Sequence, residues 1–177
     1  MATGRLFQNF GAESDPSTNA PAAVAYTASS AGAPTNGAVL RFRSRDFDAA
    51  TDESIQLTFL LPSNYSSGGT LNVSWLTTVT TGNVVWKTSY VLIHPSSEGT
   101  PTDYDAGAFT TVTSQAAVAV PGTAGYVKQQ ALDLGVTGAH AGDLLTVMFG
   151  RDADNASDTA AADVKLLEPW LLSFTII

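Results

Sequence analysis

Apolar and polar residues alternate along most of this chain, in short runs that end at glycine, proline, asparagine or aspartate. Residues 70–79 (TLNVSWLTTV) alternate in this way, residues 80–83 (TTGN) carry a turn signal, and residues 84–93 (VVWKTSYVLI) follow directly. A period of two places successive side chains on opposite faces of a β-strand. A turn between two such runs favours antiparallel pairing. The pattern therefore predicts an all-β protein.

The same alternation recurs to the end of the chain, and turn residues divide it into about eight strands. The predicted strands cover residues 38–44, 54–61, 70–80, 83–94, 108–120, 125–134, 143–151 and 163–177. Strands of this number and length fit one antiparallel β-sandwich, and two four-stranded Greek keys would make it a jelly roll. A seven-stranded immunoglobulin-like sandwich is the alternative. Pro169 interrupts the last strand, so it should lie at an edge or a bulge.

The first 37 residues differ from the rest, because small, polar and turn-forming residues dominate them. We expect an extended N-terminal arm over residues 1–37, followed by one jelly-roll domain over residues 38–177. Two interpretations of the arm remain open: a disordered tail, or a docking arm that becomes ordered on a neighbouring subunit. An ordered arm would need backbone hydrogen bonds, for example by adding a strand to a neighbour's sheet. The candidate contact residues of the arm are Arg5, Leu6, Phe7 and Phe10.

Charge excludes some partners. Charged residues make up 14% of the chain and the net charge is −8, so much of the surface must be uncharged and suited to packing against copies of itself or a neighbour. Arg41, Arg43 and Arg45 alternate on one predicted strand, but acidic residues follow them directly. Because nucleic-acid binding needs clustered basic groups, we expect no nucleic-acid partner.

The chain has no cysteine, so disulfides, thiolate metal sites and cysteine catalysis are excluded. Its N-terminal segment lacks the apolar region of a secretory signal. No apolar stretch approaches the ~18 residues that a membrane-spanning helix needs. We therefore expect synthesis in a cytoplasm and no membrane partner.

Catalytic patterns are missing from the sequence. His94 and His140 each follow or precede turn residues at predicted strand ends, where we interpret them as loop-capping residues. A hydrolase triad needs a base, an acid and a nucleophile within reach of each other, and no nucleophile elbow is present. Zinc needs three or four nitrogen or sulfur ligands, and the chain has two histidines. We expect no enzyme activity, no metal ligands and no cofactor.

The most polar stretch is residues 151–159 (RDADNASDT). Asp152, Asp154 and Asp158 could offer carboxylates to calcium, although the spacing is not that of an EF-hand. The alternative is a strand-connecting loop whose side chains cap their own backbone, with Arg151 paired to one aspartate. We favour the loop.

Aromatic residues raise the possibility of a sugar-stacking platform. Trp75 and Trp86 lie on alternating apolar stripes, where core packing is the more common role. Tyr65 and Tyr104 lie next to turn signals and are the best candidates for exposed loop aromatics.

Taken in order, several motifs carry a resemblance to known proteins. They are residues 51–65 (TDESIQLTFLLPSNY), 69–75 (GTLNVSW), 82–86 (GNVVW), 141–151 (AGDLLTVMFGR) and 158–159 (DT). This order resembles a group of bacteriophage virion proteins with jelly-roll domains, among them capsid decoration (cement) proteins and fibre-like head or tail appendages. The likeness covers residues 38–177 and consists of strand and turn patterns, so no catalytic residue can be carried over.

The resemblance implies a structural role. It implies a homotrimer that binds the major capsid protein on the outer surface of the phage head and stabilises the shell. The virion would then be its location. The alternative is a receptor-binding or carbohydrate-binding domain of a tail or head fibre.

Overall fold

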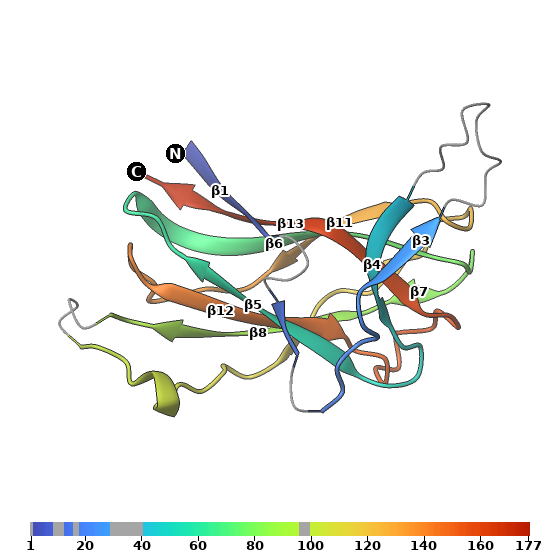
Figure 1. Cartoon of the computed structure of the whole chain (residues 1–177), viewed down its shortest axis with the longest axis horizontal. Coiled ribbons are helices and arrows are strands. Elements are labelled where there is room, and N and C mark those ends of the chain that lie inside the picture. The colour runs from blue at the N-terminus through green and yellow to red at the C-terminus, as the bar shows by residue number, and fades with distance from the viewer. Residues whose placement is uncertain (1, 9–12, 16–17, 29–40, 96–99) are drawn as a thin grey trace.

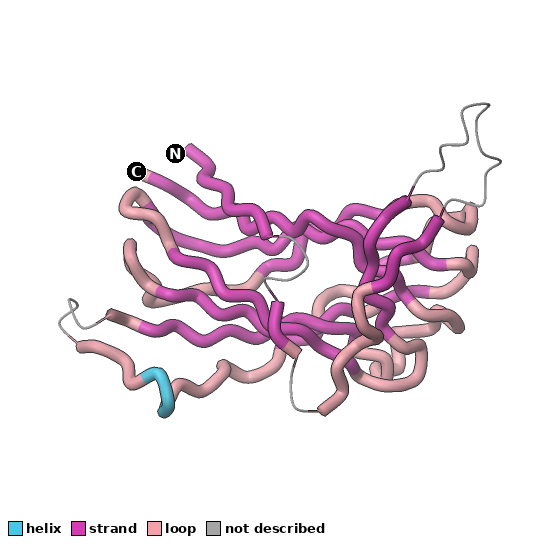
Figure 2. Tube along the Cα trace, viewed as in Figure 1, coloured by secondary structure: helices cyan, strands magenta, loops and turns pink. Residues whose placement is uncertain are grey.

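The computed structural model describes residues 2–8, 13–15, 18–28, 41–95 and 100–177, and its regular structure is almost entirely β-strand. Two large antiparallel sheets, sheet A and sheet B, lie one above the other in Figure 1. Strands fill most of the trace in Figure 2, where the short 3-10 helix η1 (Tyr104–Ala106) stands out in a loop. The protein is an all-β, antiparallel sandwich with a jelly-roll fold, as the alternation predicts.

Sheet A has the strand order β11-β6-β13-β4-β3, and β1 also pairs with β13. Its strands are β1 (Ala2–Gln8), β3 (Ala25–Ala28), β4 (Arg41–Phe47), β6 (Tyr65–Thr77), β11 (Lys128–Asp133) and β13 (Val164–Ile176). The long strand β13 is the spine of this sheet, because it pairs with β6 on one side and with β4 and β1 on the other. The two ends of the chain therefore lie side by side (Figure 1).

Sheet B has the strand order β2-β5-β12-β8-β9. Its strands are β2 (Glu13–Ser14), β5 (Glu53–Leu60), β8 (Trp86–Ile93), β9 (Thr113–Ser114) and β12 (Leu144–Arg151). A separate short ladder joins β7 (Asn83–Val84) to β10 (Val118–Ala119). Strand β12 is central, and its register against β5 and β8 decides which outer side chains become neighbours.

Aromatic residues fill the centre of the core. Trp75 from sheet A and Trp86 from sheet B are both fully buried, and their ring centroids lie 6.3 Å apart. Phe47 meets Trp86 edge-on, with centroids 5.6 Å apart and planes at 81°. Phe149 lies 6.3 Å from Trp170, which is also fully buried. Edge-to-face contacts of this kind stabilise a core beyond the burial of area alone, and the predicted core role of the two tryptophans is confirmed.

Strand β13 changes register against β6 between Leu167 and Leu171. Pro169, which has no N–H to donate to the ladder, lies inside this irregular segment. The prediction that Pro169 marks a bulge or an edge is confirmed. The bulge also separates the half of β13 that pairs with β4 from the half that pairs with β1.

The predicted strand over residues 108–120 is wrong in its extent. Only β9 and β10, two residues each, form there, and most of the segment is exposed loop. The loop follows the edge of β8 through isolated hydrogen bonds, from Thr110 N to Tyr90 O (2.8 Å) and from Gln115 N to Trp86 O (2.7 Å). Its β-forming residues lack an apolar face, so little burial is available to hold a continuous strand.

The N-terminal segment, expected as an extended arm, runs along the chain's own sheets where it is described. β1 pairs with β13, β2 with β5 and β3 with β4. Gly4 allows the close approach of β1, because a Cβ atom there would lie 2.2 Å from a ring carbon of Phe174. The division of the chain at residue 37 and any contact of residues 1–37 with a neighbour stay predictions.

Candidate functional site

The outer face of sheet B carries a row of apolar side chains. Leu60, Leu144 and Ile93 lie side by side across β5, β12 and β8, because Leu144 is in register with both of the others. Leu60 is 63% exposed and Leu144 is half-buried. Contiguous apolar side chains on an exposed face can mark an interaction surface, whereas single ones are ordinary. We refer to these three residues as the Leu60 row.

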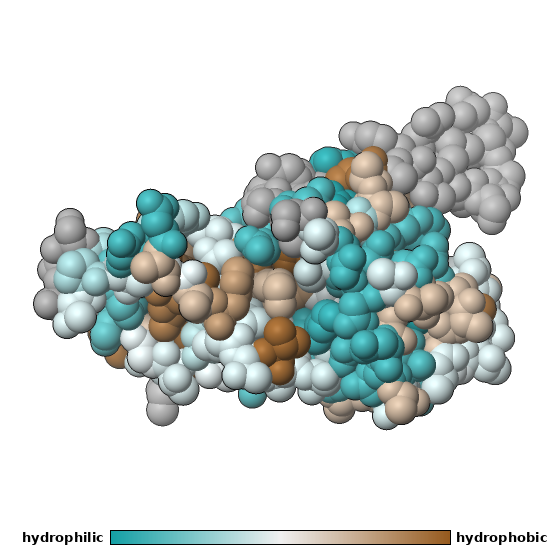
Figure 3. All heavy atoms as spheres, turned by 90° about the horizontal axis from the view of Figure 1, so that it is seen from below, coloured by the Kyte–Doolittle hydropathy of each residue, from teal (hydrophilic) through white to brown (hydrophobic). Residues whose placement is uncertain are grey.

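The rows that follow along the strands mix polar and apolar side chains, with Val91 beside Thr146 and Met148 between Gln56 and Ser89. Thr58 and Thr146 come next, and their hydroxyl oxygens are 2.9 Å apart. At the far end of β8, Lys87 forms an ion pair with Asp52. Figure 3 looks onto this side of the molecule and shows hydrophobic groups through its middle beside a hydrophilic region on its right. The outer face of sheet B is thus apolar at one end and charged at the other.

A loop borders the apolar end and adds aromatic side chains to it. Tyr104, in η1, is 66% exposed, and Phe109 is half-buried. A Cβ atom on Gly107 would lie 3.0 Å from Ile93 Cδ1, so the loop passes close over the end of β8. A small pocket of about 140 Å³ lies between the loop and the sheet. This loop covers Ile93 and leaves Leu60, on the other side of the row, open.

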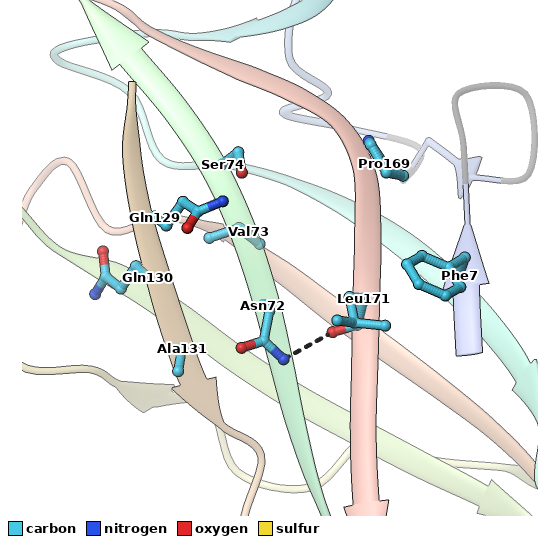
Figure 4. A pocket seen from close by; sticks show the side chains of 9 residues that line it. All are labelled: Phe7, Asn72, Val73, Ser74, Gln129, Gln130, Ala131, Pro169 and Leu171. Carbon is cyan, nitrogen blue, oxygen red and sulfur yellow. Dashed lines mark hydrogen bonds between the residues drawn. The ribbon is translucent and has the colours of Figure 1, made fainter. Parts of the chain in front are cut away.

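The outer face of sheet A contains a shallow groove of about 410 Å³ (Figure 4). Its lining includes Phe7 and Pro169 on one side and Gln129 on the other, with Asn72 and Leu171 between them. Phe7 is 64% exposed. The Asn72 amide is held in place, because its Nδ2 donates to Leu171 O at 3.1 Å. The groove was not predicted from the sequence, since it needs the pairing of β1 with β13 as well as the bulge at Pro169.

The residues predicted for the arm are divided between the two faces of β1. Leu6 points inward and packs against the core, whereas Arg5 and Phe7 are exposed. Phe10 lies outside the described residues. Of the three that the structure describes, Phe7 is the one that lines the groove on sheet A.

The two candidate loop tyrosines have different positions. Tyr104 is exposed, as predicted. Tyr65 is 6% exposed, so the prediction that it is an exposed loop residue is wrong: β6 begins at Tyr65, and the ring packs 5.6 Å from that of Phe174. Its hydroxyl donates to Gly68 O at 2.9 Å. Burial, and then the negative charge of Asp143, raise the pKa of this hydroxyl.

The polar loop at residues 151–159 is organised by an internal ion pair. Arg151 is 0% exposed, and its Nη2 donates to Asp158 Oδ1 at 2.7 Å while its Nε donates to Oδ2 at 3.1 Å. Asp158 Oδ2 also accepts a hydrogen bond from Val85 N at 2.9 Å. The prediction that Arg151 pairs with one aspartate of this loop is confirmed.

Carboxylates of Asp52, Asp152 and Asp154 lie within 4.8 Å of one another at the same end of the sheet. Asp52 is paired with Lys87, and Asp152 Oδ2 accepts a hydrogen bond from Ser114 Oγ at 2.6 Å. Burial would raise the pKa of Asp52, but the hydrogen bond from Lys87 and those from backbone amides outweigh it and lower the pKa. Asp158, the third predicted calcium ligand, is occupied by Arg151.

At the opposite end of sheet B, the two histidines meet at one buried carboxylate. His94 follows β8, His140 lies in the loop before β12, and Asp143 immediately precedes β12. His94 Nδ1 is 2.9 Å from Asp143 Oδ1, and His140 N donates to Asp143 Oδ2 at 2.7 Å. Asp143 therefore caps the turn and orients His94. The sequence prediction treated the histidines as separate loop caps and missed that they share Asp143.

No protein-family model matches the sequence, and no curated protein matches it. Several solved structures align with most of this chain at low identity. The CBM22-1 xylan-binding domain of Paenibacillus barcinonensis Xyn10C aligns over 95% of this chain and 89% of its own, with a TM-score of 0.45 and 8% identity. The CBM35 of Cellvibrio japonicus Abf62 aligns over 96% and 92%, with a TM-score of 0.40 and 10% identity.

A viral structure also aligns with this chain. The infectious bursal disease virus Gx strain structure covers 83% of this chain and 38% of its own, with a TM-score of 0.37 and 10% identity. Among the described residues, no helix has the length and apolar character needed to cross a membrane.

Proposed function

We propose that this chain is a structural virion protein, a capsid decoration protein that binds the outer surface of a bacteriophage head as a homotrimer. The resemblance of the ordered strand and turn motifs to phage virion proteins supports the class of protein. The observation that carries the proposal is the Leu60 row, in which an exposed Leu60 lies beside a half-buried Leu144 on the outer face of sheet B. It supplies a docking surface that is independent of the N-terminal segment.

The docking surface would comprise the Leu60 row and the neighbouring loop that carries Tyr104 and Phe109. Each copy would bury little area, and full removal of one Leu side chain from water contributes only about 1.5–3 kcal/mol. Linked copies on a lattice raise the effective affinity without any strong single contact. A trimer would multiply the weak contact in this way, so the proposal needs no catalytic or charged site.

The test uses purified expanded heads that lack the decoration protein. Leu60→Lys places a charge in the docking surface at a position exposed enough to tolerate it, and we expect head occupancy to fall strongly. Ala131→Lys, at an exposed position on the outer face of sheet A, is the matched control and should bind as the unmodified chain does. Equal occupancy for both variants would remove the Leu60 row from the proposal.

The oligomeric state of the variants shows whether the Leu60 row contacts the phage head or another copy of the chain. Static light scattering should give a trimer for the unmodified chain and for Leu60→Lys. A monomer for Leu60→Lys alone would reassign the Leu60 row to the contact between copies. A monomer for the unmodified chain would contradict the homotrimer.

A second candidate function is saccharide binding by a fibre domain, favoured by the groove on sheet A. An exposed aromatic ring, Phe7, faces amide groups across this groove, and stacking combined with amide hydrogen bonding suits a sugar. A glycan array tests it, with Phe7→Ala as the groove variant and Tyr104→Ala as the matched aromatic control. Binding that Phe7→Ala loses and Tyr104→Ala retains would support the fibre alternative, and an array without hits would exclude it for the glycans tested.

A further inference from the structure

Both histidines of the chain lie at the same place, although 45 residues separate them in the sequence. The turn before β12 brings His140 over Asp143, and the antiparallel pairing of β8 with β12 brings His94 to the same carboxylate. The two imidazole rings are 5.5 Å apart, with their planes tilted by 44°. Two imidazoles and a carboxylate are the ligand types that divalent transition metals prefer.

The spacing of the ligand atoms is close to that of a metal site. One nitrogen or oxygen from each of His94, His140 and Asp143 lies within 4.8 Å of the others. His94 Nδ1 is 2.9 Å and His140 Nδ1 is 3.9 Å from the nearer carboxylate oxygen. Metal–ligand bonds of about 2.0–2.1 Å in a tetrahedral site place ligand atoms roughly 3.3 Å apart. Rotation of the exposed His140 ring is the main adjustment needed.

The carboxylate of this site is buried, whereas one of its two imidazoles is open to solvent. The Asp143 side chain is 0% exposed, His94 is 24% exposed and His140 is 63% exposed. A metal can therefore enter beside His140 and reach a carboxylate that the fold has already fixed. A nearby cation favours the charged form of a buried carboxylate, and a bound metal ion would supply that charge.

We propose that His94, His140 and Asp143 bind a divalent transition metal, with Zn(II) as the probe. Three protein ligands leave a coordination position for water on the exposed side. The acidic group at Asp52 does not compete for the same ion, since oxygen ligands alone suit harder cations. The site lies next to the Leu60 row, because Asp143 precedes Leu144 and His94 follows Ile93 along the chain, but it does not depend on the proposed docking.

The experiment titrates the full, tag-free chain with Zn(II) by calorimetry and with Co(II) by visible absorption. We expect one ion per chain and the intense absorption of tetrahedral Co(II). His140→Ala removes an exposed imidazole but keeps the backbone N–H that donates to Asp143, so its melting temperature without metal should be unchanged. Loss of this direct ligand should weaken Zn(II) binding at least about tenfold.

The matched control is Asp154→Asn, which alters the acidic group at the other end of sheet B. It should bind Zn(II) as the unmodified chain does. His94→Gln, the second ligand variant, should weaken binding in the same way as His140→Ala. The proposal is overturned if the unmodified chain binds no ion, if both histidine variants bind with unchanged affinity, or if Asp154→Asn alone abolishes binding.

Discussion

Asp158 and Asp143 are buried carboxylates at opposite ends of sheet B, and the fold treats the two differently. Asp158, with a side chain 1% exposed, is paired through two hydrogen bonds with the guanidinium of Arg151, which is itself fully buried. Asp143 is equally buried but faces only imidazoles and a backbone N–H among its described partners. At one end, a guanidinium of the same chain neutralises the carboxylate. At the other end, the carboxylate faces imidazoles, which can bind a proton or a metal ion.

The carboxylate at one end of sheet B therefore stabilises the fold, whereas the carboxylate at the other end is available as a metal ligand. A buried charge with a fixed partner holds two elements together but is unavailable for exchange with solvent. A buried carboxylate next to an exposed histidine leaves ligand atoms that a metal ion from solvent can reach. We therefore expect substitutions at the Arg151 end to change stability, and those at the Asp143 end to change stability less and metal binding more.

Arg151→Met should have the largest effect. It leaves Asp158 as an uncompensated buried charge and removes the hydrogen bonds that Arg151 donates to Ala160 O and Ala162 O. Breaking one side of a buried ion pair typically costs about 3–5 kcal/mol. Urea unfolding measures the loss, with Arg5→Met as the exposed control. A variant as stable as the control would show that the pair does not hold this end together.

Gly150→Ala should have the next largest effect. A Cβ atom there would lie 1.9 Å from Glu53 O, which is backbone and cannot rotate away. Strands β12 and β5 would have to separate beside Arg151, at a cost of about 1–3 kcal/mol. Gly122→Ala is the matched control, because nothing lies within 4 Å of its Cβ position. Equal melting temperatures for the two variants would contradict the close approach.

Asp143→Asn should cost less, about 1–2 kcal/mol, because the amide oxygen can still accept one of the two hydrogen bonds. The other position would hold an NH₂ group facing either His94 or the N–H of His140. Urea unfolding in the presence of a chelator isolates this effect from metal binding. Asp105→Asn, at an exposed position in η1, is the control. A loss as large as that of Arg151→Met would erase the distinction between the two ends.

Alternation predicted most of the sandwich, and its failures have physical reasons. Alternation did not predict the strand over residues 2–8, because Leu6 is the one large apolar side chain on the inward face of β1. Tyr65 was predicted as a loop residue because Gly68 and Gly69 resemble a break, yet β6 continues through them, with Gly68 at a φ of 77°. Local pattern thus identifies strands with two or more inward apolar residues and misses those held mainly by their neighbours.

The candidate sites were less predictable than the strands. Arg151 and Asp158 are seven residues apart, so their pairing could be predicted from one loop. His94 and Asp143 are 49 residues apart, and only the register of β8 against β12 brings them together. A one-residue change in register would have turned every side chain of β8 to the opposite face. The groove on sheet A depends on the bulge at Pro169, which the sequence indicated, and also on the pairing of β1 with β13, which it did not.

Glu53→Gln should have the smallest effect and sharpen the comparison at the Arg151 end. Glu53 is the register partner of Arg151, yet burial raises its pKa above the ordinary 4.5, and the charges of Asp48 and Asp163 add to the shift. A raised pKa in the folded state means that stability is highest below pH 4.5 and falls as the pH rises through the folded value. Glu53→Gln should remove this fall and keep an acceptor for Asp48 N.

The variant should therefore equal the unmodified chain below pH 4.5 and exceed it at pH 7, by no more than about 0.5 kcal/mol. Urea unfolding at several pH values measures the difference, with Gln56→Glu as the reciprocal control on the same strand. If the Glu53→Gln variant were less stable than the unmodified chain at pH 7, the positive charge of Arg151 would be stabilising an ionised Glu53. The guanidinium would then be shared between two carboxylates, and the Arg151 end would be an ion network instead of a closed pair.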